Sequence, residues 1–155
     1  MSAAAFVSYH ADANGAMRTR HAVARRGATA VDSGPSMSRN PNIHTRRAGV
    51  ADIELLGPLF DAYRVFYGKA SDVALARAFL LDRLRHDQSV VFIALRPDGT
   101  ALGFTQLYPI FSSISLAPAF VLNDLYVAPE ARRTGVAVRL LGTAADHGRG
   151  AGAVR

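Results

Sequence analysis

One stretch near the end of the chain constrains the fold more than any other. Residues 120–127 are mainly apolar and aromatic, and they are followed by Pro129, which cannot donate a hydrogen bond to a sheet. Residues 129–134 form a polar, basic turn. From Gly135 onward the apolar residues repeat with a helical period, at Ala137, Leu140, Leu141 and Ala144. The pattern predicts a buried strand, a basic turn and then a helix.

The beginning of that expected helix is suited to binding an anion. The first N–H groups of a helix have no partner within it and carry partial positive charge. Gly135 and Ala137 leave room for a phosphate to approach the backbone, and Arg132 and Arg133 add full charges beside it. These residues predict a site for a phosphorylated ligand. The alternative interpretation is an ordinary strand-to-helix connection with a basic turn.

The charge of the chain is concentrated in its first 47 residues. This segment holds seven arginines against two aspartates, whereas residues 48–155 hold eleven basic and ten acidic side chains. The second part therefore lacks the basic face of a nucleic-acid-binding domain, and we expect no nucleic-acid partner. No apolar run is long enough to cross a membrane, so a membrane partner is not expected either. The chain has no cysteine, which fits a cytoplasmic location.

The motif resembles a known signature when its full length is considered. Residues 125–137 contain Arg132-Arg133-Thr134-Gly135-Val136-Ala137 directly after a strand that ends Leu-Tyr-Val-Ala-Pro. This is similar to the acetyl-CoA signature of the GNAT superfamily of N-acetyltransferases. The resemblance implies that backbone N–H groups from Arg133 to Val138 hold the pyrophosphate, and that the strand pairs with the pantetheine arm. The cofactor-binding residues it implies are Leu125, Tyr126, Val127, Arg132, Arg133, Thr134, Gly135, Val136, Ala137 and Val138.

The order of elements expected along the chain fits the first part of that fold. Residues 1–41 are expected to be a disordered basic extension, and 42–155 an incomplete GNAT-like domain. We expect a strand at 42–48, helices at 51–68 and 71–87, strands at 89–95 and 101–108, a loop at 109–118, and then the motif, whose helix ends at Gly148. Ser71 is the expected N-cap of the second helix, and Pro58 is expected to kink or interrupt the first. The fold class is α/β (α+β): a mostly antiparallel sheet flanked by helices, in the order β-α-α-β-β-β-α.

The family pattern continues beyond what this sequence contains. The resemblance implies a fifth strand, a fourth helix and a final hairpin, and here Ala153 and Val154 look like the beginning of that strand. The function expected is transfer of an acetyl group from acetyl-CoA to a primary amine of a small molecule or peptide. The alternative is a truncated, non-catalytic remnant that binds coenzyme A weakly or not at all. A third hypothesis makes residues 1–47 a nucleic-acid-binding arm.

The residues that would carry the chemistry are less clearly marked. Acetyl transfer needs a group that removes a proton from the amine. Asn123 lies where some polyamine-acetylating relatives place a glutamate, but an amide cannot accept a proton. Asp124 can, although strand alternation predicts that it faces away from Asn123 and a purely structural role is the competing interpretation. Tyr108 is a candidate for the wall of the acceptor pocket.

The sequence also leads to expectations about metals and partners. The histidines have no metal-ligand spacing, so no metal is expected. The acceptor is expected to be a polyamine, an amino acid, an aminoglycoside or a protein N-terminus, and the sequence does not choose among them. The sequence leaves open whether the chain forms a homodimer.

Overall fold

A four-stranded antiparallel sheet forms the centre of the protein. The computed structural model describes residues 7–11, 17–21 and 42–154. The sheet contains β3 (His44–Arg47), β4 (Val90–Leu95), β5 (Ala101–Ser112) and β6 (Ala117–Val127), hydrogen-bonded in that order. The expected fold class, including the element order after residue 42, is confirmed.

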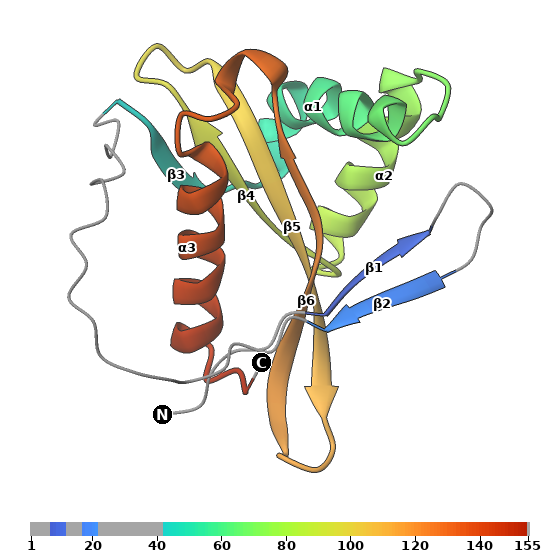
Figure 1. Cartoon of the computed structure of the whole chain (residues 1–155), viewed down its shortest axis with the longest axis vertical. Helices are drawn as coiled ribbons and strands as arrows, with labels where there is room; N and C mark the ends of the chain where they lie inside the picture. The colour runs from blue at the N-terminus through green and yellow to red at the C-terminus, as the bar shows by residue number, and fades with distance from the viewer. Residues whose placement is uncertain (1–6, 12–16, 22–41, 155) are drawn as a thin grey trace.

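Helices cover both faces of this sheet (Figure 1). Helices α1 (Ile53–Phe66) and α2 (Val73–Arg85) lie on one face, and α3 (Val136–Gly150) lies on the other. Because its side chains alternate between the two covered faces, β4 is buried along its whole length. Val91 and Ile93 join the core under α1 and α2, while Phe92 and Ala94 join the core under α3. Two hydrophobic cores therefore fix the sheet between its helices.

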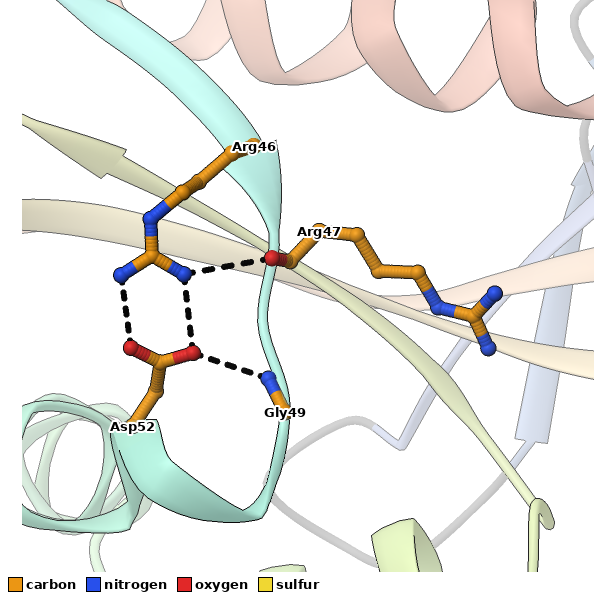
Figure 2. A network of polar contacts seen from close by, with 4 residues as sticks. All are labelled: Arg46, Arg47, Gly49 and Asp52. Carbon is orange, nitrogen blue, oxygen red and sulfur yellow. Dashed lines mark hydrogen bonds and ion pairs between the residues drawn. The ribbon is translucent and has the colours of Figure 1, made fainter.

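The connection from β3 into α1 is held by a bidentate ion pair (Figure 2). The Arg46 guanidinium donates to both carboxylate oxygens of Asp52, at 2.6 and 2.9 Å, and also to the Arg47 carbonyl. The Gly49 amide donates to the same carboxylate at 2.9 Å. Hydrogen bonds from Arg46, helped by that amide, hold the pKa of Asp52 below its usual range. A short 3₁₀ turn, η1 (Val50–Asp52), leads into α1, which runs without interruption through Pro58.

Helices α1 and α2 are tied together by a buried carboxylate. Asp61 of α1 accepts a hydrogen bond from the Ser71 hydroxyl at 2.6 Å and another from the Asp72 amide at 2.7 Å. The expectation that Ser71 caps α2 is wrong, because its hydroxyl is directed to Asp61. Asp72 is the N-cap instead, and its carboxylate accepts from the Leu75 amide at 2.8 Å.

Strands β5 and β6 are longer than the sequence indicated. The loop expected at 109–118 is mostly strand, because Pro109 to Ser112 pair with Phe120 to Ala117. Figure 1 shows this hairpin continuing past the helices. Its tip exposes apolar side chains, including Phe111, Ile114 and Leu116. Because these residues are exposed, they do not alternate between apolar and polar as a half-buried strand does, and the sequence pattern of 109–118 therefore resembles a loop.

Two short strands lie inside the segment expected to be disordered. β1 (Val7–Ala11) and β2 (Met17–His21) form an antiparallel pair, and β1 lies beside β6. The rest of residues 1–41 lies outside the described part of the chain, so the domain boundary at residue 42 stays a prediction. In the described ranges no helix is long and apolar enough to span a bilayer.

Candidate functional site

The corner between β6 and α3 has the geometry of an anion site. After β6 the chain passes through a 3₁₀ turn, η2 (Pro129–Ala131), and then reaches Gly135, the N-cap of α3. Gly135 has φ +88° and Arg133 has φ +63°, both in the left-handed region. Helix α3 begins one residue later, at Val136, so the N–H groups of its first turn face outward from the corner without helical partners.

A hollow of about 230 Å³ lies at this corner. Two arginines provide its positive charge, and the Cβ position of Gly135 faces open space, with no atom within 4 Å. Arg132 is oriented by two contacts: its Nε donates to the Val127 carbonyl at 3.2 Å, and its guanidinium lies 5.7 Å from the centre of the Phe66 ring. The lining residues include Val127, Arg132, Arg133, Gly135, Val136, Ala137 and Val138.

The remaining predicted cofactor residues lie nearby but outside this lining. The Thr134 hydroxyl donates to the Ala131 carbonyl at 2.7 Å and so braces the turn. Leu125 and Tyr126 belong to β6, which is the last strand in the sheet order. The Tyr126 ring is buried in the core beneath α1. At Tyr126 the backbone, and not the ring, is therefore the part available to a ligand at the sheet edge.

The apolar face of α3 differs from the predicted one at three positions: Val136 is added to it, Ala137 is only half-buried, and Leu141 is exposed. Val136, Leu140 and Ala144 are buried, whereas Leu141 is exposed. Because the helix begins at Val136, its buried stripe follows steps of four from that residue. This face anchors the first turn of α3 on the sheet and so fixes the corner rigidly.

A β-bulge places the candidate chemical groups together. Gln106 pairs with Asp124, whereas the next residue, Leu107, pairs with Leu122, so Asn123 is the extra residue of β6. The expectation that Asn123 and Asp124 face opposite ways is wrong, because the bulge breaks the alternation. The Asn123 amide donates to the Asp124 carboxylate at 3.0 Å.

Asp124 lies at the centre of a polar cluster inside the sheet. Only 4% of the residue is exposed, and burial raises the pKa of its carboxyl, although hydrogen bonds from Tyr63 and Asn123 oppose this shift. Burial, reinforced by the hydrogen bond to Asp124, raises the pKa of Tyr63 as well. The Asp124 backbone is also fixed, since the buried Thr105 hydroxyl donates to its carbonyl at 2.8 Å.

Tyr108 and Gln106 complete this cluster from β5. The Gln106 amide donates to the Tyr108 hydroxyl at 3.0 Å, and its own oxygen has no hydrogen-bond partner among the described residues. Burial, followed by the nearby Asp124 carboxylate, raises the pKa of Tyr108. Tyr63 and Gln106 were not among the predicted site residues. Tyr63 falls on the apolar stripe of α1 in the sequence and so has the pattern of a core residue, whereas the signal for Gln106 is a polar residue inside an apolar strand.

Comparison with known proteins identifies the family. Residues 56–155 match the model of the acetyltransferase (GNAT) family. The chain belongs to the GNAT family. It is also 47% identical over 105 residues to an uncharacterized N-acetyltransferase, YhfO, of Bacillus subtilis. This match covers 68% of the present chain and 70% of the relative. The GNAT resemblance seen in the sequence is confirmed, and homology supports an acetyltransferase enzyme.

Solved structures agree with this assignment. The crystal structure of a probable acetyltransferase has a TM-score of 0.70 and 47% identity, covering 72% of this chain and 75% of that one. A Clostridium acetobutylicum protein solved as a "predicted acetyltransferase with acetyl-CoA" has a TM-score of 0.60, covering 73% of this chain and 77% of that one. Its identity is 15%, so this second likeness concerns the fold alone. Among the described residues, no group of histidine, aspartate or glutamate side chains could hold a metal ion.

Proposed function

We propose that this GNAT domain transfers an acetyl group from acetyl-CoA to a primary amine. The observation that carries the proposal is the corner at Gly135, where a helix N-terminus, two arginines and an open hollow meet. The pyrophosphate would accept hydrogen bonds from the amides of the first turn of α3, and the pantetheine arm would run along the edge of β6. The remnant hypothesis is not favoured, because homologues named acetyltransferase match about two thirds of the chain.

Asp124 is the proton acceptor in this proposal. The attacking amine must lose its ammonium proton before it can bond to the thioester carbonyl carbon. A buried carboxylate with a raised pKa is suited to take that proton, and Tyr63 and Asn123 keep it oriented. The C–S bond then breaks, the departing thiolate takes the second nitrogen proton, and Asp124 returns its own proton to solvent.

Calorimetric titration with coenzyme A tests the binding half of this proposal. The Arg132→Ala, Gly135→Asp double variant should lose binding, because it removes one positive charge and places a negative one at the corner. An Arg132→Ala, Gly135→Asn variant is the matched control, since asparagine also tolerates the left-handed region without adding charge. The aspartate variant should bind more weakly than the asparagine variant. Equal, unreduced affinity in both variants would show that the corner is not the site.

Release of free thiol from acetyl-CoA tests the chemical half. Asp124→Asn should lower kcat while leaving the affinity for coenzyme A unchanged, since Asp124 does not line the corner. Undiminished kcat in this variant would exclude Asp124 as the proton acceptor.

A further inference from the structure

A second hollow lies between α1 and α2 and has an aromatic wall. Its volume is about 420 Å³, within the range of small-molecule sites. Phe60 and Phe79 stack on each other in its lining, with ring centroids 5.6 Å apart and nearly parallel planes, at 7°. Tyr63 and Tyr67 meet edge to face at 5.0 Å. Such a wall suits a flat or apolar ligand body.

The charged residues that line this hollow are both cations. Arg64 and Lys69 belong to the lining, and no carboxylate of the described chain does. Arg64 lies 3.4 Å from Asp61, whose oxygens already accept shorter bonds from Ser71 and the Asp72 amide. Lys69 is exposed and its side chain pairs with no described residue. The hollow therefore offers positive charge to a ligand.

Tyr63 joins this hollow to the polar cluster on the sheet. Its ring forms part of the aromatic wall, and its hydroxyl is hydrogen-bonded to the Asp124 carboxylate. A ligand that fills the hollow would therefore touch the Tyr63 ring, whose hydroxyl is directed to Asp124, and would also touch Lys69; Asp124 itself is buried and lies outside the lining. These two contacts differ in charge preference, since an ammonium group suits the carboxylate beyond Tyr63 and an anion suits the lysine.

We infer that the acceptor is an amino acid-like molecule with its amine and its carboxylate at opposite ends of an apolar or aromatic body. This inference rests on the proposed function and names the substrate class of that same site. The aromatic wall would hold the body, Lys69 and Arg64 would pair with the carboxylate, and the amine would point toward Asp124. A polycationic amine such as an aminoglycoside would be repelled by the two cations.

Equilibrium binding of a matched pair of probes tests the inference. The probes are 4-(aminomethyl)benzoate and 4-(aminomethyl)benzamide, which share the amine and the ring and differ in the anionic group. Binding is measured by calorimetry on the full chain, with and without saturating coenzyme A, and kanamycin serves as the polycationic comparison. The benzoate should bind at least tenfold more tightly than the benzamide, and kanamycin more weakly than either.

Two variants assign that preference to the hollow. Lys69→Gln should reduce the preference for the benzoate by about tenfold and leave the benzamide affinity unchanged. Arg85→Gln, which removes an equal charge from the exposed end of α2, should leave the preference intact. Turnover of both probes should follow the same order in kcat/KM.

The possible failures can be told apart. Equal affinity for the two probes, an unchanged preference in Lys69→Gln, or tighter binding of kanamycin would overturn the inference. Each of these results is read from the probe titrations without coenzyme A, and so does not depend on acetyl transfer. Absence of coenzyme A binding in the wild-type chain would instead overturn the proposed function.

Discussion

Gly103 is the position where one added methyl group should do the most damage to the site. It pairs with Val127 across β5 and β6, and a Cβ built on it would lie 2.4 Å from the Tyr126 carbonyl oxygen. It would also lie 3.1 Å from the Val127 Cα. Both neighbours are backbone atoms of β6, so no side-chain rotation relieves the clash. The strand itself must move.

The size of the effect follows from that distance. An ordinary carbon–oxygen contact begins near 3.4 Å, so the Tyr126 carbonyl must retreat by about 1 Å. Forced overpacking of this kind costs about 1–3 kcal/mol in the free energy of unfolding. The same displacement moves the backbone of Tyr126 and Val127, where we propose that the pantetheine arm binds. Gly103→Ala should therefore weaken coenzyme A binding as well.

Urea denaturation and coenzyme A titration measure the two effects. Gly142→Ala provides the matched control, since it adds the same methyl group inside α3, where no atom lies within 4 Å. Alanine in a helix interior should stabilise the protein by about 0.5–1 kcal/mol. The two variants should therefore change stability in opposite directions, and only Gly103→Ala should alter affinity. Equal stability and equal affinity in both would refute the argument from backbone contact.

Three further substitutions test the packing and the electrostatics. Leu140→Ala creates a cavity at a fully buried position on the inner face of α3. It should lower the free energy of unfolding, measured by urea denaturation, by about 2–5 kcal/mol. A loss below about 1 kcal/mol would contradict the packing described. Hydrogen bonds from Ser71 and the Asp72 amide lower the pKa of Asp61, so its stabilisation is present above its ordinary pKa and is lost as pH falls; Asp61→Asn should remove this dependence in denaturation curves from pH 3 to 7. Burial raises the pKa of Asp124, so the folded state binds more protons and loses stability as pH rises through that pKa. Asp124→Asn should unfold at higher temperature than the wild type at pH 7, and a lower temperature would refute this sign.

The sequence predicted the corner because its signals are local. Pro129 ends a strand, Gly135 supplies a left-handed residue, and a helical period follows, all within one stretch. The structure confirms the order of these elements, but it changes the buried face of α3, extends that helix from the expected Gly148 to Gly150, and begins the strand at Ala117. Backbone geometry at Gly135 follows from its neighbours in sequence, so no long-range contact was needed to predict it.

The polar cluster could not be predicted in the same way. Its assembly depends on the bulge at Asn123, which is a property of how β6 pairs with β5 and which reverses the expected direction of a side chain. Tyr63 comes from α1, sixty-one residues before Asp124 in this chain. The role of Ser71 could not be predicted for the same reason. Its hydroxyl could cap a helix, but in the folded chain it donates a hydrogen bond to Asp61 of the neighbouring helix.

Coenzyme A binding at the corner can be observed residue by residue in amide NMR spectra of the full chain. During titration with coenzyme A, the largest shifts should occur at the backbone N–H groups of residues 133–138, followed by those of residues 125–127. Arg85 and the other residues of α2 should shift little. Saturable binding whose largest shifts lie in α2 or β3, with residues 133–138 unmoved, would contradict the account.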